Sequence, residues 1–504
     1  MDTLPTYDEL PYDSLPLPET QPDFLAAIAW LHGHAAPDPG QARVLELGCA
    51  AGGNLIPLAY HHPEASFIGI ELSRRQAQAG ADFIAALGLK NIRIVHGDLA
   101  ALPADLGAFD YIIAHGVFSW VPPAVQQALL DVCRTRLTPQ GLAYISFNVA
   151  AGWHKLLPLR QALLAGTDPD LPAPQRVQQA YAVLNRLETE SCDPLMLQEV
   201  RYLQTAAPSY LFHEFLAEHN APKTFADFGQ QLRDAGLQYV AEAGPRTAVV
   251  AIDKADALTP ASLTRRWMDA ETSLDETLQT RFRRALVSRD DAPPAQPPQA
   301  QRLQELAFYC ELTSDAEIDL DAACEQDFLN ATGNRFAVSH PLLKAALMAL
   351  STAYPAAMRY ADCLQAAEAC MTHFAARGSR DPTEFREALF NLVCVQGVIP
   401  SVPGERLQTP DDTALRALAL ARLQAATPGW VVSGARQTAI GLDAPGRALL
   451  AMLDGTKTLD QLTQIMWKWL VDAGQERDIG TVDNLVRQKI ALFARHGLLQ
   501  APTD

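Results

Sequence analysis

The chain has 504 residues, of which 48% are hydrophobic, and a formal net charge of −18 at neutral pH. This length is too great for one hydrophobic core and indicates about two to four domains, and the hydrophobic content is typical of a folded protein. The negative charge argues against a general nucleic-acid binder, because phosphate binding needs clustered lysine and arginine side chains.

The sequence shows neither a membrane anchor nor a secretion signal. Charges interrupt the longest apolar runs well before the ~20 residues of a membrane span, and the opening MDTLPTYDELPYDSLPLPET is acidic and rich in proline. The eight cysteines are scattered without a CxxC pair, and Cys363 and Cys370 are spaced to share one helix face. We therefore expect a cytoplasmic protein with reduced thiols and no membrane insertion.

After an N-terminal segment at 1–40, residues 41–255 show the pattern of an α/β domain. Strands are predicted at 43–48, 66–72, 91–98, 109–116 and 141–148, and helices at 54–62, 74–88 and 123–137. Alternation of this kind gives a parallel sheet with helices on both faces. A helical insertion is predicted at about 153–222, after which a helix at 224–236 and strands at 237–243 and 247–252 resume the sheet.

The remaining sequence indicates two further domains. Residues 260–400 are mixed, with a proline-rich linker at 290–301 and helices predicted near 340–354, 360–376 and 382–394. Beyond a break at 398–405, residues 405–504 alternate short helices with turns, as a small winged-helix module does. This last part holds 11 Lys or Arg and 11 Asp or Glu, so it lacks the basic stripe of a groove-reading helix, and we expect no nucleic-acid partner.

A glycine-rich turn separates the first predicted strand from its helix in VLELGCAAGGNLIPLA, at 44–59. Backbone N–H groups and the helix dipole at such a turn attract a ligand. No lysine completes a GxxxxGK[ST] phosphate loop, and the spacing fits the dinucleotide pattern GxGxxG poorly. The pattern ExGxGxG of S-adenosylmethionine (SAM) turns fits Glu46, Gly48, Ala50 and Gly52, with Ala50 in place of the middle glycine, which requires an allowed backbone angle there.

Two acidic residues end the next two predicted strands. Glu71 is placed to accept hydrogen bonds from ribose hydroxyls, and Asp98 to accept one from the adenine amine. Acids would repel a diphosphate, whereas SAM carries a sulfonium cation. In this order, the turn and the two acids favour S-adenosyl-L-methionine as the cofactor.

Segments from most of the chain carry a family resemblance. They include YDELPYDSLPLPETQP, LELGCAAGGNLIPLA, FIGIELS, AHGVFSWVP, FNVAAGW, YLFHEFLAEHNAP, RFAVSHPLLKAALMAL and LDAPGRALLAMLDGTKTLDQL. The sequence resembles class I SAM-dependent methyltransferases with a methyltransferase regulatory domain, and among them the bacterial protein lysine methyltransferases known from rickettsiae. The resemblance implies a Rossmann-like SAM methyltransferase sheet with a helical insertion, a regulatory domain at 260–400, a winged-helix-like domain at 405–504, and a homodimer formed through the inserted helices.

The resemblance also assigns cofactor contacts. It places the methionine end of SAM against Glu46, Gly48, Cys49, Ala50, Gly52 and Asn54, the ribose against Glu71 and Leu72, and the adenine against Gly97, Asp98 and Leu99. It brings Tyr7 and Tyr12 of the N-terminal segment close to the cofactor. His115 follows the fourth strand and contacts donor or acceptor, while Ser119 and Trp120 cover the pocket mouth. A purely structural role for His115 and for Trp120 is the alternative.

Asn148 and Trp153, after the fifth strand, are the candidates for binding the acceptor amine. Asn148 can orient an amine through its side-chain oxygen, and Trp153 can wall an alkylammonium stem. The family pattern is similar to Tyr-Asn-Thr-Tyr-Pro-Gly-Trp, but here the sequence is FNVAAGW, which lacks the hydroxyl groups of that pattern. No unique general base is visible, and a site that binds the neutral amine is sufficient, since desolvation lowers a lysine pKa.

Three functions remain open at this point. The first is a protein lysine methyltransferase, the second a small-molecule methyltransferase, and the third a SAM-binding scaffold, which the intact cofactor motifs disfavour. A metal site is not expected, because the two histidines of HEFLAEH, His213 and His219, are six residues apart and lie on different helix faces.

Overall fold

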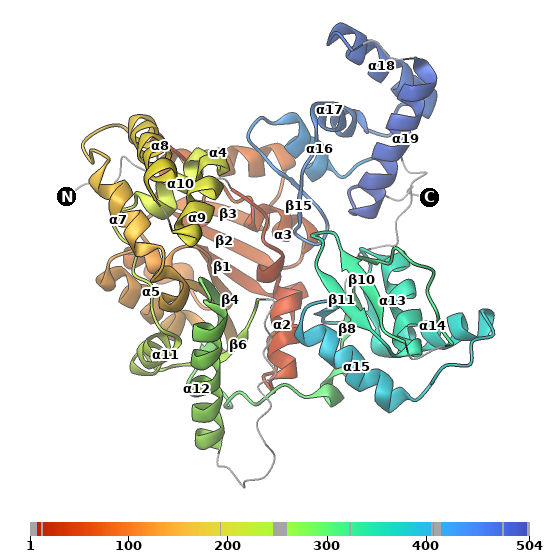
Figure 1. Ribbon diagram of the computed structural model, residues 1–504, viewed down its shortest axis with the longest axis horizontal. Helices are drawn as coiled ribbons and strands as arrows, with labels where there is room; N and C mark the ends of the chain where they lie inside the picture. The colour runs from red at the N-terminus through yellow and green to blue at the C-terminus, as the bar shows by residue number, and fades with distance from the viewer. Residues whose placement is uncertain are drawn as a thin grey trace.

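A seven-stranded sheet forms the centre of the computed structural model (Figure 1), which describes residues 8–11, 14–191, 193–244, 260–321, 324–404, 407, 415–475 and 478–500. The strand order is β3-β2-β1-β4-β5-β7-β6. The bounds are β1 Arg43–Leu47, β2 Ser66–Glu71, β3 Ile92–His96, β4 Phe109–Ala114, β5 Leu137–Asn148, β6 Leu237–Glu242 and β7 Phe282–Arg289. The first five strands are parallel, and β7 runs antiparallel to both β5 and β6.

The predicted α/β sheet is confirmed for β1 to β6, and β7 is an addition that the sequence analysis did not predict. This strand lies beyond residue 255, where the sequence analysis ended the methyltransferase domain, yet it completes the same sheet. The strand predicted at 247–252 lies outside the described residues.

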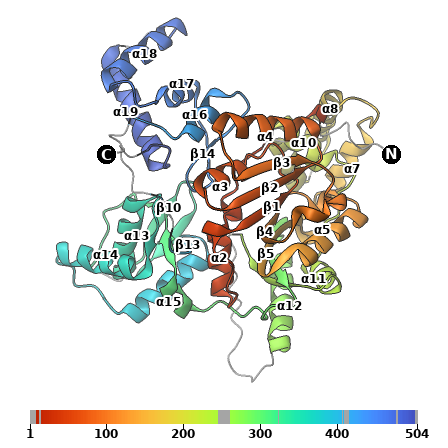
Figure 2. The same cartoon turned by 180° about the vertical axis from the view of Figure 1, so that it is seen from behind.

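Helices cover both faces of the sheet because alternate strand residues point to opposite sides. One face packs against α2 (Pro22–Leu31), α3 (Leu55–His61) and α4 (Arg74–Leu87), and the other against α5 (Pro123–Arg136), α11 (Phe225–Asp234) and α12 (Pro260–Leu278). Figure 2 shows α3 and α4 on the near side. Short 3₁₀ turns connect these elements at Pro18–Thr20, Pro39–Gln41, Leu99–Ala101, Ala104–Leu106, Phe118–Trp120 and Ala300–Glu305.

The predicted helical insertion is present and has its own apolar core. It consists of α6 (Ala150–Trp153), α7 (Leu157–Ala165), α8 (Ala173–Glu190), α9 (Pro194–Thr205) and α10 (Pro208–Phe215). Leu163, Leu184 and Leu211 are fully buried in this core, which also takes in Trp153. In Figure 1 these helices are yellow and lie at one end of the sheet.

The region after β7 packs on the sheet rather than standing apart. It contains β8 (Ala307–Tyr309), β9 (Leu312–Thr313), β10 (Gln326–Asn330), β11 (Arg335–Val338), α13 (Pro341–Ala353), β12 (Met358–Arg359), α14 (Tyr360–His373), α15 (Pro382–Cys394) and β13 (Ile399–Ser401). The three predicted helices are confirmed, and Cys363 and Cys370 both lie on α14. One continuous hydrophobic core joins this region to α2 and to one face of the sheet.

The C-terminal region has a separate core and the predicted short helices. Its elements are α16 (Ala419–Ala426), β14 (Val432–Ser433), β15 (Ala439–Ile440), α17 (Ala444–Met452), α18 (Leu459–Asp472) and α19 (Ile479–Arg495). A capping box between Thr458 and Gln461 begins α18. Within the described ranges, no helix is long and apolar enough to cross a membrane.

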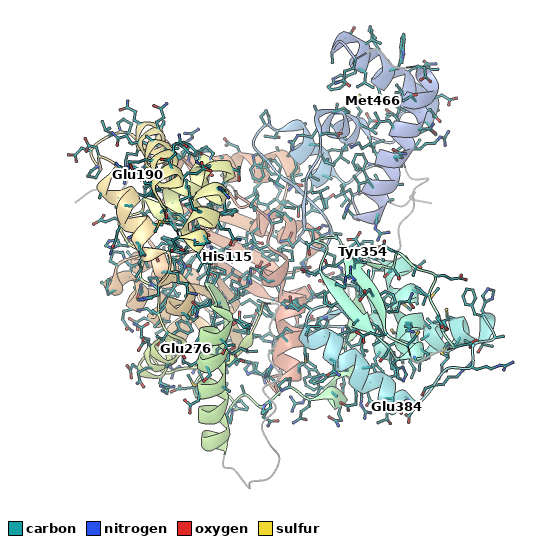
Figure 3. The ribbon with its side chains drawn as sticks, viewed as in Figure 1. His115, Glu190, Glu276, Tyr354, Glu384 and Met466 are labelled. Atoms are coloured by element: carbon teal, nitrogen blue, oxygen red, sulfur yellow. The ribbon has the colours of Figure 1, made fainter. Side chains whose placement is uncertain are left out.

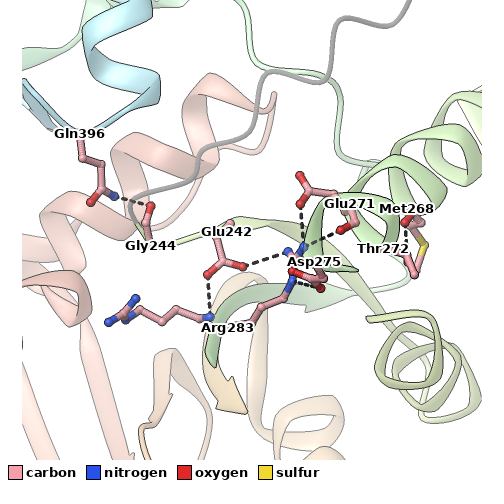
Figure 4. Close-up of polar contacts among 9 residues, drawn as sticks. Glu242, Gly244, Met268, Glu271, Thr272, Asp275, Arg283 and Gln396 are labelled. Atoms are coloured by element: carbon pink, nitrogen blue, oxygen red, sulfur yellow. Dashed lines mark hydrogen bonds and ion pairs between the residues drawn. The ribbon is translucent and has the colours of Figure 1, made fainter. Parts of the chain in front are cut away.

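A buried ionic cluster attaches α12 to the sheet (Figure 4). Arg283 on β7 donates to Asp275 and Glu271 at 2.8 Å each and to Glu242 at 3.2 Å, and its guanidinium lies 4.2 Å from the ring centroid of Phe225. Burial raises the pKa of Glu242, and the neighbouring guanidinium opposes that rise. Since removing one partner would leave buried charges unpaired, the cluster fixes β7 and therefore Arg281 and Phe282 at its start.

Candidate functional site

A cavity of about 1420 Å³ opens between the carboxyl ends of the parallel strands and the helical insertion. Ligands of open α/β sheets bind at this edge. Of the predicted site residues, the cavity is lined by Glu46, Gly48, Cys49, Ala50, Asn54, Glu71, Leu72, Gly97, Asp98, Leu99, His115, Trp120, Asn148 and Trp153. Gly52 and Ser119 do not line it. Figure 3 marks His115 between the strands and the insertion helices.

The glycine-rich turn adopts left-handed backbone angles, with φ of 73° at Gly48, 50° at Ala50 and 80° at Gly52. A Cβ at Gly52 would approach the Cδ1 of Ile94 to 2.7 Å, so this glycine serves the packing beneath the turn. Ala50 adopts an angle that costs an L-residue about 1–2 kcal/mol. Its N–H donates to Glu71 Oε2 at 2.8 Å, which holds it in this conformation.

Glu71 links the turn to the start of α4. Its Oε1 accepts from the Ser73 N–H at 2.7 Å, while its Oε2 accepts from Ala50. Burial raises the pKa of this carboxyl group, and the backbone hydrogen bonds oppose the rise. Each carboxylate oxygen has a second lone pair, so Glu71 can still accept hydrogen bonds from ribose hydroxyls in the cavity.

Glu46 and Asn54 form the floor of the turn. Asn54 Nδ2 donates to Glu46 Oε1 at 3.0 Å, and both residues are 4% exposed. Burial raises the pKa of Glu46 to about 8. Glu46 Oε2 is buried without a hydrogen-bond partner among the described residues, so it is the natural acceptor for an ammonium group of a bound ligand.

The end of β3 is more open than the turn. Asp98 is exposed, and its carboxylate accepts from the Ala100 N–H at 2.8 Å. A Cβ at Gly97 would meet nothing within 4 Å, so there is space beside it for a flat ring. Leu72 is 40% exposed and, with Leu99, adds apolar lining to this end of the cavity.

His115 and Ser119 differ in their relation to the cavity. His115 Nδ1 lies 2.9 Å from the Tyr144 hydroxyl, and burial lowers the pKa of this histidine to about 4, so its ring is neutral at physiological pH. Ser119, predicted at the pocket mouth, is 1% exposed, and its hydroxyl accepts from the Asn148 N–H at 2.8 Å. Ser119 therefore supports Asn148 from behind rather than covering the mouth.

Asn148 and Trp153 come together at the end of β5. Asn148 Nδ2 donates to Asn220 Oδ1 at 3.1 Å. This hydrogen bond occupies the NH₂ group of Asn148 and leaves its Oδ1 to accept. Trp153 meets Trp120 edge to face at 6.0 Å between centroids and packs on Phe215 at 5.7 Å. Trp153 is therefore both part of the insertion core and part of the cavity wall.

The N-terminal segment crosses the turn and reaches the insertion. Tyr7 and Tyr12 lie outside the described residues, but their neighbours show its course. Ser14 Oγ accepts from the Gly53 N–H at 2.7 Å, and Glu9 accepts from the Ala173 N–H at 2.8 Å. His213 Nε2 donates to the Leu10 carbonyl oxygen at 2.7 Å. No group of three potential metal ligands is present among the described residues.

The insertion contributes cavity residues that the sequence analysis missed. They are Glu199, Tyr210, Glu214 and Phe215, joined by Arg281 and Phe282 from the start of β7. Arg281 forms an ion pair with Glu199 at 2.9 Å. Burial raises the pKa of Glu214 to about 7. In a sequence, an acidic residue on an amphipathic helix is typical of the solvent-exposed face. Only the packing of α9 and α10 over the sheet places Glu199 and Glu214 in the cavity wall.

These features fit SAM. A buried carboxylate oxygen on Glu46 suits its ammonium group, a second carboxylate on Glu71 suits its ribose, and open space beside Gly97 suits its adenine. The residues present therefore match the cofactor that the sequence predicts.

Comparison with protein families gives matches in three parts of the chain. Residues 44–141 match the methyltransferase domain, 207–289 the predicted methyltransferase regulatory domain, and 416–492 the PKMT C-terminal winged helix domain. The regulatory match thus ends with β7, ahead of most of the region at 260–400 that the sequence analysis assigned to that domain.

Two proteins of Rickettsia prowazekii are similar in sequence. Uncharacterized protein RP789 is 33% identical over 68% of this chain and 65% of its own length, and uncharacterized protein RP028 is 32% identical over 44% of this chain and 92% of its own length. The chain thus spans just under two thirds of RP789.

A solved structure shares the fold of almost the whole chain. PKMT2 from Rickettsia typhi, in complex with AdoHcy, superposes with a TM-score of 0.80 over 97% of this chain and all of that one, at 21% identity.

Proposed function

We propose that this chain transfers the methyl group of S-adenosyl-L-methionine to lysine side chains of a protein. It belongs to the family of methyltransferases that combine a regulatory domain with a PKMT-type winged helix. The observation that carries the acceptor proposal is the lining of the cavity beyond the turn, where Trp153, Tyr210 and Phe215 surround the acids Glu199 and Glu214. Aromatic faces and carboxylates are the groups that bind an alkylammonium ion.

The charges in this half of the cavity favour one cationic group. Glu199 is already paired with Arg281, while no ion pair is recorded for Glu214 among the described residues. An incoming lysine ammonium would therefore meet Glu214 as the uncompensated carboxylate. Since burial raises the pKa of Glu214 to about 7, this group can take a proton from the ammonium near neutral pH and release it to solvent afterwards.

Methyl transfer itself is an in-line displacement at carbon. Bound SAM supplies an electrophilic methyl group on a sulfonium, and the new C–N bond forms as the C–S bond breaks. Asn148 accepts one N–H of the neutral amine through Oδ1 and so aims the lone pair, while Trp153 and Trp120 exclude water. His115 stays neutral and fixes Tyr144 beside the cavity.

The experiment follows radiolabelled methyl groups from SAM into a native proteome and, in parallel, into its metabolite extract. We expect label in lysine residues of polypeptides, and label confined to small molecules would contradict the acceptor proposal. Glu214→Gln should lower turnover at least about tenfold and leave SAM affinity unchanged. Glu190→Gln, an exposed acid of the same insertion, is the matched control and should behave as the wild type.

We also propose a cytoplasmic homodimer formed through the insertion. Leu195 and Tyr202 on α9 are 58% and 50% exposed, which is unusual for large apolar side chains on a helix that already has a buried face. The seven described cysteines are all free, as a reducing compartment allows. Light scattering that shows only a 54.8 kDa species at micromolar concentration would contradict the dimer.

A further inference from the structure

The loop that joins β14 to β15 in the C-terminal region contacts the SAM turn directly. Gln437 in this loop is 2% exposed and has a left-handed backbone angle, with φ of 54°. Its Nε2 donates to the backbone carbonyl oxygen of Asn54 at 2.8 Å, across 383 positions of sequence. Figure 1 shows β15 and Figure 2 shows β14 beside α3, the helix that begins directly after Asn54.

The amide of Gln437 is oriented by its own domain. Its Oε1 accepts from the Ser433 hydroxyl at 3.2 Å, so its NH₂ group points at the turn. The preceding residue in the loop, Arg436, places its guanidinium 3.6 Å from the ring centroid of Tyr309. Its carbonyl oxygen accepts from Gln21 Nε2 at 3.1 Å. The loop is therefore held on both sides and cannot shift without breaking buried contacts.

Asn54 is the residue on which these contacts converge. Its Oδ1 accepts from the Leu17 N–H at 3.1 Å, from the Thr20 hydroxyl at 3.0 Å and from Gln437 at 3.4 Å. With its oxygen engaged three times, Asn54 must direct Nδ2 to Glu46 Oε1. That choice leaves Glu46 Oε2 as the oxygen available to a ligand.

We infer that Gln437 is a positioning residue for the cofactor site, through which the winged-helix domain completes the SAM turn. The inference rests on the proposed function in one respect, since it takes SAM as the ligand of that turn. Loss of the Gln437 donor leaves the backbone carbonyl group of Asn54 without this partner and removes one of the three donors to its Oδ1. Asn54 is then held less firmly, and so is the carboxyl group of Glu46 that it orients.

The test compares two variants of the full-length chain. Gln437→Met keeps the length of the side chain and removes its hydrogen bonds, whereas Trp430→Ala removes a docking contact of the same domain, the stack of Trp430 on Phe83 at 3.7 Å, without touching Asn54. Calorimetry should show SAM affinity about tenfold weaker in Gln437→Met and within about twofold of wild type in Trp430→Ala. The KM for a lysine-containing acceptor should stay unchanged in both.

Hydrogen exchange provides a readout that does not depend on SAM. In Gln437→Met the amides of residues 52–56 should exchange faster than in the wild type, and in Trp430→Ala they should not. Wild-type affinity together with unchanged exchange in Gln437→Met would overturn the inference, and so would equal losses in the two variants. A wild-type chain that fails to bind SAM would instead contradict the proposed function, and the exchange comparison would still decide the role of Gln437.

Discussion

Replacement of Glu71 by glutamine isolates the charge that joins the turn to α4. In the structure its two oxygens accept from Ala50 at 2.8 Å and from Ser73 at 2.7 Å, and the side chain is 7% exposed. Glutamine has nearly the same shape but offers one oxygen and one NH₂ group. One of the two backbone N–H groups would therefore face another donor and lose its partner.

The magnitude follows from these contacts. A hydrogen bond to a charged group contributes about 1.5–3 kcal/mol, and a buried donor left without a partner costs about 1–3 kcal/mol. Part of this free energy is lost from the stability of the folded protein, and part from the binding of the ligand. We expect SAM affinity to fall about 10- to 100-fold, which corresponds to about 1.4–2.8 kcal/mol, and the melting temperature to fall by a few degrees.

Calorimetry and thermal unfolding on the same preparation separate the two effects. Glu276→Gln, an exposed acid on α12, serves as the control and should change neither quantity. A folded Glu71→Gln variant that binds SAM as tightly as the wild type would refute the role of Glu71 in the site, whatever happens to its melting temperature.

Other substitutions test other parts of the same reasoning. Ala50→Gly should raise the free energy of unfolding by up to about 1 kcal/mol, because glycine adopts the left-handed angle of this position without strain. Ala375→Gly, at φ of 51° in an exposed position, is the control that should raise it likewise without changing SAM affinity. Equal melting temperatures of the wild type and both variants would count against strain at Ala50. Asn148→Ala should lower turnover about tenfold with unchanged SAM affinity, and a destabilised variant with normal turnover per folded molecule would remove Asn148 from the acceptor site. Burial lowers the pKa of His32 to about 4, so between pH 6.5 and about 4 this histidine is protonated in the unfolded chain but not in the folded one. The free energy of unfolding should therefore fall with pH in this range, by at most about 1.4 kcal/mol per pH unit. Denaturant titrations of His32→Gln should show a smaller slope.

The cofactor half of the site was predictable because its signals are local in sequence. Glu46, Ala50 and Glu71 lie within two consecutive strand–turn–helix units, and the parallel sheet brings their ends to one edge. The structure adds what the pattern could not contain, namely that Ala50 adopts the angle of a glycine and that Glu71 supports it through a hydrogen bond.

The acceptor half could not be predicted in the same way. Glu199 and Glu214 lie on helices whose patterns indicate only an amphipathic surface, and their function depends on which face packs over the sheet. The strand β7 was not predicted. The adjacent arginines of FRRALVSR interrupt the apolar pattern of a buried strand, and in the structure Arg283 is buried against three carboxylates. Gln437 has no local signal, since its contact spans 383 positions.

The charges of the two halves together suit the binding of two cations. SAM carries a sulfonium and lysine an ammonium, and they repel each other unless the cavity between them is negative. Glu71 and Asp98 lie on the donor side and Glu214 on the acceptor side, so each cation has an acidic group of its own. Transfer of the methyl group moves one positive charge from sulfur to nitrogen and leaves the thioether with one charge less, while the methylated lysine is again a cation. Under the proposed function, the donor side therefore loses more of its electrostatic attraction than the acceptor side when the methyl group is transferred.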